Sequence, residues 1–199
     1  MLIRRWMTKN PTVIESTKTL GEAKRMMDRG KFRRLPVMEK GVLVGIITER
    51  DLRQQAGHLD HTRVDAVMAK PVITVTPDML LDRAAHLMVK HKVGGFPVIE
   101  DNKVVGMITA IDLLRAFAEV LGAVEEGVSR VDLAFSGSSF DLAVIASLVG
   151  QLSGELLGMG SYEGEGADKV IYVRVRAEDA HRVADMLTQN DFSVLAIHQ

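Results

Sequence analysis

The feature that most constrains this chain is an internal duplication in its first 113 residues. The stretch 7–52 matches the stretch 68–113 at an offset of 61 residues, and the register holds without a gap. The matched pairs include Met7 and Met68, Leu20 and Leu81, Ala23 and Ala84, Met27 and Met88, Pro36 and Pro97, Gly45 and Gly106, Thr48 and Thr109, and Asp51 and Asp112. A repeat of this length is a folding unit, too long for a solenoid turn. Two such units can pack together and leave two related clefts, which favours a binding function over a catalytic one.

Composition places the chain among globular proteins. Of its 199 residues, 47% are hydrophobic and 26% are charged, enough for one large core or two to three small ones. No run approaches the roughly 18 apolar residues of a membrane-spanning helix, and the start lacks the apolar stretch of a signal peptide. There is no cysteine, which excludes disulfides and thiolate sites. The sequence therefore predicts a cytoplasmic protein without a membrane partner.

Charge is unevenly distributed, although the formal net charge is only −1. Residues 1–63 carry 14 Lys and Arg against 7 Asp and Glu, whereas residues 119–199 carry 5 against 13. This asymmetry indicates two different kinds of domain. A basic front end can attract an anionic ligand or an acidic partner; the alternative is an ordinary solvated surface.

Each repeat predicts the element order β-α-β-β-α. The first strand is expected at 12–14 and again at 73–76, with helix starts at Ser16-Thr17 and at Thr76-Pro77-Asp78. A hairpin follows in each repeat, at 35–48 and 96–109, and a second helix begins after Thr48 or Thr109.

The C-terminal part changes pattern and predicts β-α-β-β-α-β, a ferredoxin-like arrangement. Alternating apolar residues indicate strands near 131–135, 170–175 and 192–197, with helices near 140–152 and 180–187. A weaker strand, interrupted by Gly158 and Gly160, is expected near 155–161. The fold class is therefore α/β (α+β), with one repeat at 1–60, a second at 61–122 and a third domain at 128–199.

The motif that carries most information is Gly-x-x-Thr-x-x-Asp, which ends at Asp51 and at Asp112. A strand ends at the Thr and a helix begins there, so an ordinary helix cap is one interpretation. Three observations favour a ligand site: the motif occurs twice, its flanking pattern also repeats, and Asp is shorter than the usual capping Glu. A carboxylate can accept hydrogen bonds from both hydroxyls of a ribose. The two interpretations are compatible.

With these residues the tandem repeat resembles a pair of CBS domains, often called a Bateman module, over about residues 1–121. The resemblance implies that Asp51 and Asp112 hold the ribose of an adenosyl ligand and that Thr48 and Thr109 lie near its α-phosphate. It implies base contacts from the first strands and phosphate contacts from basic residues. The remaining candidate nucleotide-binding residues are Thr12, Val13, Arg33, Arg34, Arg50, Ile73, Thr74 and Pro97.

The two clefts are expected to differ. Arg33 and Arg34 in the first repeat match Gly94 and Gly95 in the second, and Arg50 matches Ile111. The Arg-bearing element favours a polyphosphate, whereas the two glycines leave room but little charge. The sequence predicts a stronger, phosphate-accepting site near the first repeat.

The C-terminal domain resembles an ACT domain, and the whole chain is similar to acetoin-utilisation proteins of the AcuB type. In ACT domains a loop after the first strand binds amino acids at a dimer interface. Here that loop is 135–141, which has Gly137 but lacks the acid and the Pro-Gly pair. Amino-acid binding is therefore not predicted, and dimerisation is.

These observations predict a ligand-sensing regulatory homodimer, not an enzyme, in acetoin or related carbon metabolism. The ligand would be AMP, ADP, ATP or a relative; no cofactor is required, although Mg²⁺ would accompany ATP. Two alternatives stay open: an enzyme or subunit of acetoin or amino-acid metabolism, and a nucleic-acid-binding regulator. No nucleophile–base pair supports the first, and no nucleic-acid-binding motif the second. His58 and His61 lack a third ligand for a metal, so no metal site is predicted.

Overall fold

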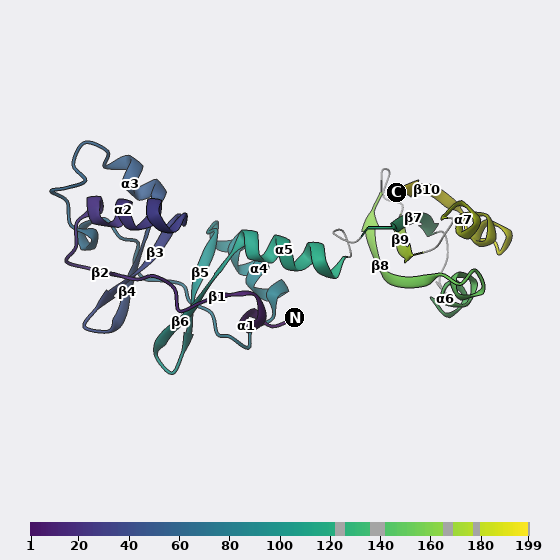
Figure 1. Cartoon of the computed structure of the whole chain (residues 1–199), viewed down its shortest axis with the longest axis horizontal. Coiled ribbons are helices and arrows are strands. Elements are labelled where there is room, and N and C mark those ends of the chain that lie inside the picture. The colour runs from purple at the N-terminus through teal and green to yellow at the C-terminus, as the bar shows by residue number, and fades with distance from the viewer. Residues whose placement is uncertain (122–125, 136–141, 165–168, 177–179, 199) are drawn as a thin grey trace. The chain divides into compact units, whose positions relative to one another are not determined.

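The structure is a computed structural model that describes residues 1–121, 126–135, 142–164, 169–176 and 180–198. It contains two compact units, Met1–Leu114 and Arg115–Gln199, whose elements are labelled in Figure 1. The boundary between the units falls within helix α5 (Ala110–Val120).

The two repeats form two similar three-stranded sheets. The first repeat contains β2 (Ile14–Glu15), α2 (Leu20–Gly30), β3 (Arg34–Glu39), β4 (Val42–Thr48) and α3 (Glu49–Gln54), followed by the 3₁₀ turn η1 (Val64–Ala66). The second contains α4 (Leu81–His91), β5 (Gly95–Glu100), β6 (Lys103–Thr109) and α5. In each repeat the two longer strands form an antiparallel hairpin, as predicted.

The cores of the repeats are built from matched positions. At the 61-residue offset, each of the following pairs is buried on both sides: Ile14 and Val75, Leu20 and Leu81, Ala23 and Ala84, Met27 and Met88, Leu35 and Phe96, Val37 and Val98, Ile47 and Ile108, Leu52 and Leu113. The i, i+3, i+7 spacing in α2 and α4 turns these residues to one face of each helix. The duplication in sequence is therefore a duplication of the packed core.

The start of each repeat pairs with the other repeat, which the sequence pattern did not predict. Strand β1 (Thr8–Lys9) lies at the chain start but pairs with β6, with Thr8 opposite Met107. At the matched position Ala69 bridges to Ile46 of the first repeat. Short helix α1 (Ile3–Trp6) is held the same way, because Ile3 N–H donates to the carbonyl of Met79 at 3.0 Å. The repeats thus exchange their opening segments.

This exchange explains the repeated glycine of the Val-Gly motif. A Cβ on Gly45 would stand 2.2 Å from Sδ of Met68, and one on Gly106 would stand 2.5 Å from Sδ of Met7. In both repeats the opening methionine of the other repeat fills the space beside the glycine.

Local boundaries differ from the predicted ones in both repeats. Helix α4 starts at Leu81, and its N-cap residue Leu80 makes no side-chain capping hydrogen bond, so the predicted start at Thr76-Pro77-Asp78 is wrong. Helix α2 starts at Leu20 because Thr19, rather than Ser16 or Thr17, caps it and forms a capping box with Glu22. The strand expected at 73–76 is reduced to a single bridge between Val75 and Val98.

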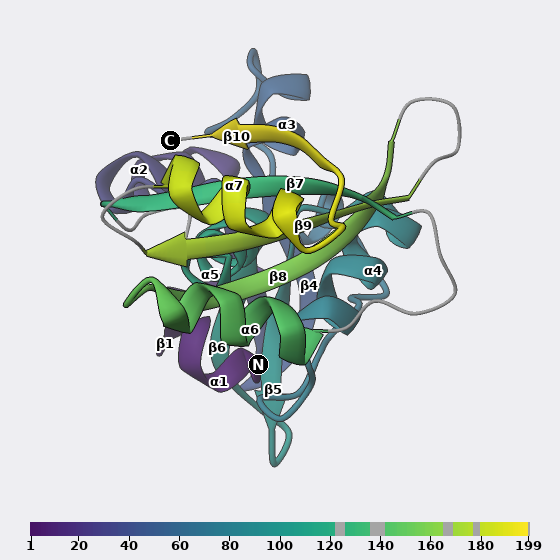
Figure 2. The ribbon, with the colours of Figure 1, turned by 90° about the vertical axis from the view of Figure 1, so that its right-hand side faces the viewer.

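The C-terminal unit is one four-stranded antiparallel sheet with two helices on one face. Its elements are β7 (Val128–Phe135), α6 (Leu142–Gln151), β8 (Glu155–Glu163), β9 (Lys169–Arg176), α7 (Ala180–Gln189) and β10 (Val194–His198). This is the predicted β-α-β-β-α-β order, and the strands lie in the order β10-β7-β9-β8 (Figure 2).

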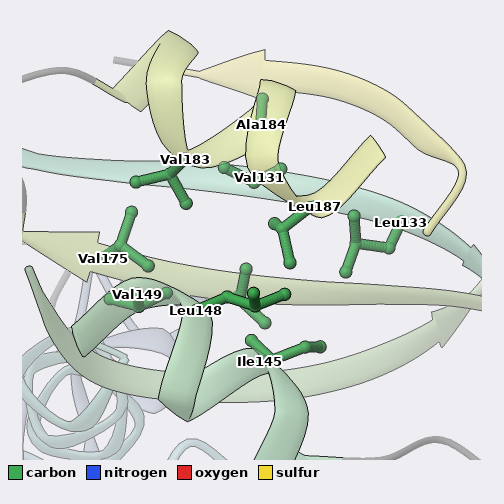
Figure 3. Close-up of a cluster of buried hydrophobic side chains, with 10 residues drawn as sticks. Val131, Leu133, Ile145, Leu148, Val149, Val175, Val183, Ala184 and Leu187 are labelled. Carbon is green, nitrogen blue, oxygen red and sulfur yellow. The ribbon is translucent and has the colours of Figure 1, made fainter. Parts of the chain in front are cut away.

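The core of this unit lies between the sheet and the helices α6 and α7. Val131, Leu133 and Val175 point from the strands toward Ile145 and Leu187 on the helices (Figure 3). Because side chains alternate along a strand, the residues between these apolar ones lie on the opposite face of the sheet. None of the described helices has the length and apolarity to cross a membrane.

Candidate functional site

The two predicted Thr–Asp pairs have the same geometry, each where a strand passes into a helix. At the end of β4, Thr48 donates from its backbone N–H and its hydroxyl to Oδ2 of Asp51, at 2.8 and 2.6 Å. At the end of β6, Thr109 donates to Oδ2 of Asp112 at the same two distances. All four side chains are half-buried.

These hydrogen bonds correct one inference from the sequence. The short Asp argued against a helix cap, yet Asp51 closes a complete capping box with Thr48, and Asp112 N–H donates to the Thr109 hydroxyl at 3.4 Å. Only Oδ2 of Asp51 is used; its Oδ1 makes no hydrogen bond within the part of the chain that the structure describes. The cap therefore leaves one oxygen of Asp51 available.

Arg34 connects the two repeats. It is the first residue of β3, yet its guanidinium donates from Nη1 to the backbone carbonyl of Gly94 in the second repeat. A Cβ on Gly94 would stand 2.8 Å from Nη2 of Arg34, and one on Gly95 would stand 2.6 Å from Nη1. The space left by the two glycines is therefore occupied by the side chain of Arg34, which contributes positive charge to the second repeat.

The charge of Arg34 interacts with the carboxylate of Asp112 in the second motif. Burial and the neighbouring charge of Arg33 lower the pKa of Arg34 from its ordinary value, and the negative charge of Asp112 partly opposes this. The guanidinium stays protonated at neutral pH, since arginine is in practice always charged in proteins. The same Gly94 carbonyl also accepts from Ala110 N–H at 3.1 Å, so Arg34 and the first residue of α5 share one acceptor.

The other predicted residues are more scattered. Arg33 and Arg50 are exposed, as are Thr12, Val13 and Thr74, while Ile73 is half-buried and Pro97 is buried within β5. Arg33 and Arg50 make no side-chain hydrogen bond or ion pair to other described residues. The structure thus brings together Thr48 with Asp51, Thr109 with Asp112, and Arg34 with the second repeat.

A hollow of about 410 Å³ lies beside β2 and α2 in the first repeat. Its wall includes Val13, and its polar groups come from three basic and two acidic side chains: Lys18, Arg25, Arg29, Glu15 and Glu22. Of the predicted nucleotide-binding residues, only Val13 lines it.

The sequence missed the direction in which Arg34 points. The signal was present, because two consecutive glycines at positions matching two arginines indicate that a large group approaches there. A repeat read by itself cannot show that this group comes from its own pseudo-equivalent residue. Within the described ranges, no three His, Asp or Glu side chains are grouped as metal ligands.

Comparison with known proteins extends these observations. The CBS domain family model matches residues 3–57 and again 64–119. The CBS domain-containing protein YhcV of Bacillus subtilis is 34% identical over 110 residues, which are 54% of this chain and 79% of that protein. Other relatives are longer: the matched region covers 46% of the length of one of them and 22% of the length of another.

Two solved structures are similar to the same part of the chain. The CBS domain pair of protein MJ0100, in complex with 5′-methylthioadenosine and S-adenosyl-L-methionine, is 30% identical with a TM-score of 0.56; the match covers 60% of this chain and 97% of that one. A Vibrio cholerae protein assigned to acetoin utilization (AcuB) is 31% identical with a TM-score of 0.55, covering 63% and 96%.

Proposed function

Because this chain belongs to the CBS domain family, we propose that its two repeats bind an adenosine-containing ligand, such as AMP, ADP, ATP or a relative, and that the protein is a regulator rather than an enzyme. The observation that carries the proposal is the duplicated Thr–Asp pair at a strand-to-helix junction, with the hydroxyl 2.6 Å from the carboxylate in both copies. The adenosine compounds bound to the similar MJ0100 pair support the ligand class.

In this proposal each aspartate holds the ribose and each threonine fixes the aspartate. Because Oδ2 of Asp51 already accepts two hydrogen bonds from Thr48, its side chain is fixed and its Oδ1 can accept a ribose hydroxyl. Hydrogen bonds to a charged group contribute about 1.5–3 kcal/mol each. Thr12, Val13, Ile73 and Thr74 are proposed to contact the base.

The two clefts are proposed to take different ligands, with the assignment altered by Arg34. The sequence favoured a phosphate-accepting site near the first repeat. Arg34 instead contacts Gly94 and lies within the field of Asp112. We therefore propose that the phosphate-bearing ligand binds beside Asp112 and that the cleft at Asp51 takes a less charged one. Arg33 and Arg50 remain candidates for additional phosphate contacts because both are exposed cations.

The C-terminal unit is proposed to be ACT-like, to dimerise and to pass the ligand state to a partner. Its element order and its strand order β10-β7-β9-β8 support this, and its terminal strands β10 and β8 offer edges for pairing. The loop that corresponds to the amino-acid loop of ACT domains, 135–141, lies outside the described residues except for its first position. Similarity to the Vibrio cholerae protein supports a role in acetoin utilization. The ligand would act by shifting populations according to its affinity difference between states.

The test is calorimetric titration of the full chain with AMP, ADP, ATP and S-adenosylmethionine. Asp112→Asn and Asp51→Asn keep an oxygen for the helix cap but remove the negative charge. We expect each to weaken binding in its own cleft by about tenfold or more, since 1.4 kcal/mol corresponds to a factor of ten. The matched control is Asp82→Asn, an exposed carboxylate in the first turn of α4, which should bind as the unmodified protein does.

A ligand that binds both Asp→Asn variants with unchanged affinity would refute the site assignment. A full panel without binding would refute the proposed ligand class.

A further inference from the structure

The face of the C-terminal sheet opposite α6 and α7 carries an unusual set of polar side chains. Along β7 the buried Val131 and Leu133 alternate with Arg130 and Asp132. Along β9 the buried Val173 and Val175 alternate with Tyr172 and Arg174. Two neighbouring outward positions on each central strand are thus occupied by ionisable groups.

Arg130 and Arg174 form a row across adjacent strands with a third ionisable residue, His198. His198 of β10 lies opposite Arg130 of β7, and Arg130 lies opposite Arg174 of β9. Like charges directly opposite each other destabilise a sheet. Among the described residues that line this face, Asp132 is a carboxylate that lies one row along.

Asp132 is committed to groups that surround it. It is 5% exposed, and it accepts hydrogen bonds from Arg130 Nε at 2.6 Å, Arg130 Nη2 at 3.0 Å and the Tyr162 hydroxyl at 2.9 Å. His198 Nε2 stands 3.5 Å from its Oδ2. Arg130 also lies over the Tyr172 and Tyr162 rings, 4.4 and 5.3 Å from their centroids. These contacts fix the position of Arg130 before any ligand arrives.

A hollow of about 370 Å³ opens over this row, lined by Val128, Arg130, Asp132, Tyr162, Arg174 and His198. Its volume is within the range of sites for small molecules. Among the described residues of this lining, two guanidinium groups face one carboxylate. Gly158 of β8 lies opposite Arg174, and a Cβ on it would meet nothing within 4 Å, so the glycine leaves open space beside Arg174.

We propose that this hollow is a binding site for a small oxyanion, a carboxylate or a phosphate, held by Arg174 and Arg130 with His198 at its edge. Planar guanidinium groups match the oxygens of carboxylates and phosphates and bind them in a bidentate manner. The site lies within the C-terminal unit, and it is independent of the adenosine site proposed for the repeats.

The experiment titrates the full chain with sodium phosphate and, separately, sodium malonate at constant ionic strength, followed by ¹H–¹⁵N NMR and calorimetry. We expect one or both anions to shift the backbone signals of Arg130, Tyr162 and His198. Arg174→Gln should weaken that binding tenfold or more. Gly158→Val should weaken it to a similar extent, because it keeps every charge but fills the open space.

Two control variants separate this site from general charge and from the repeats. Arg182→Gln removes an exposed cation from α7, which packs on the other face of the sheet. Arg34→Gln removes the cation proposed to bind phosphate in the repeats. Both should leave the signals at Arg130, Tyr162 and His198 responsive to the anion.

The outcomes are distinct. If Arg174→Gln does not fold, Gly158→Val decides the question, since a β-branched residue is favourable in a strand. Binding that is unchanged in Gly158→Val, or is lost only in Arg34→Gln, overturns the inference. Absence of any shift at the three reporter residues with both anions overturns it as well. None of these results depends on whether the repeats bind adenosine.

Discussion

At the scale of a single residue, one methyl group at Gly95 would disturb the contact between the repeats. A Cβ there would stand 2.6 Å from Nη1 of Arg34 and 2.8 Å from the carbonyl oxygen of Ile108. Both neighbours are restrained, because Arg34 donates to Gly94 and Ile108 is buried in β6. Gly95 is therefore required by packing rather than by backbone conformation.

We expect Gly95→Ala to reduce the free energy of unfolding by about 1–3 kcal/mol, the usual cost of forcing extra atoms into a packed region. Urea denaturation would measure the change. Gly57→Ala is the matched control, since a Cβ on Gly57 would meet nothing within 4 Å, and it should change stability by less than about 0.5 kcal/mol. Equal stability of the two variants would contradict the described packing.

Asp132 gives a second prediction at this scale. Burial raises the pKa of Asp132, but hydrogen bonds from Arg130 and Tyr162 and the charges of Arg130 and His198 lower it more, so the net shift is below the ordinary value. A carboxyl with a lowered pKa stabilises the fold at pH values above its unfolded pKa, near 3.9. That contribution is lost as the pH falls through the folded pKa.

We therefore expect Asp132→Asn to be less stable than the unmodified protein at pH 7 by about 1.5–3 kcal/mol. The difference should shrink as the pH falls from about 4 toward the lower pKa of the folded state, because the carboxyl takes up its proton first in the unfolded protein and then in the folded one. Thermal melts at a series of pH values would show it. A difference that stays constant down to pH 2 would mean that the carboxylate charge is not what stabilises this cluster.

At the scale of elements, the chain start serves the second repeat. Ile3 is fully buried, Leu81 N–H donates to the carbonyl of Met1 at 2.9 Å, and Arg4 forms ion pairs with Asp78 and Glu100 at 2.7 and 3.4 Å. Strand β1 adds a third strand to the β5–β6 hairpin. The second repeat therefore depends on the opening segment of the first.

We expect Ile3→Ala to lower stability by about 2–5 kcal/mol through the cavity that it leaves. Hydrogen exchange should become faster first in α4 and β6, and less so in α2 and β3, even though residue 3 belongs to the first repeat in sequence. Exchange that quickens first in α2 would contradict the exchanged arrangement of the opening segments.

The sequence predicted elements well where the signal is local. The hairpins at 35–48 and 96–109 and the helices after Thr48 and Thr109 follow from alternation, turns and caps. The exchange of opening segments could not be predicted in this way, because a pairing such as Thr8 with Met107 depends on contacts distant in sequence. The row from His198 to Arg174 was missed for the same reason: it forms only when three strands align.

At the scale of the whole molecule, two units with separate cores can respond differently to a ligand. The repeats have their own cores, and the C-terminal unit has another between its sheet and two helices. The proposed adenosine ligand would bind only the first unit. A ligand that binds only the folded state stabilises it by about 2.7 kcal/mol at 100 times its dissociation constant.

We expect a saturating adenosine ligand to slow hydrogen exchange across 3–114 more than across 128–198, because it binds only in the repeats. Malonate or phosphate should give the reverse pattern if the hollow over Arg174 binds it. Mass spectrometry of peptic peptides would separate the two regions. Protection by the adenosine ligand confined to 128–198 would contradict the proposed function.

Position 34 matches position 95 at the offset of 61 residues. If both positions carried arginine, the two side chains would have to occupy the same space. Two arginine side chains cannot both fill the space over Gly94 and Gly95, so two repeats with arginine at both positions could not adopt this arrangement. Positions 34 and 95 should therefore vary together among chains built in this way: a large residue at one should accompany glycine at the other. Such covariation would indicate that a single large side chain fills the space between the two repeats.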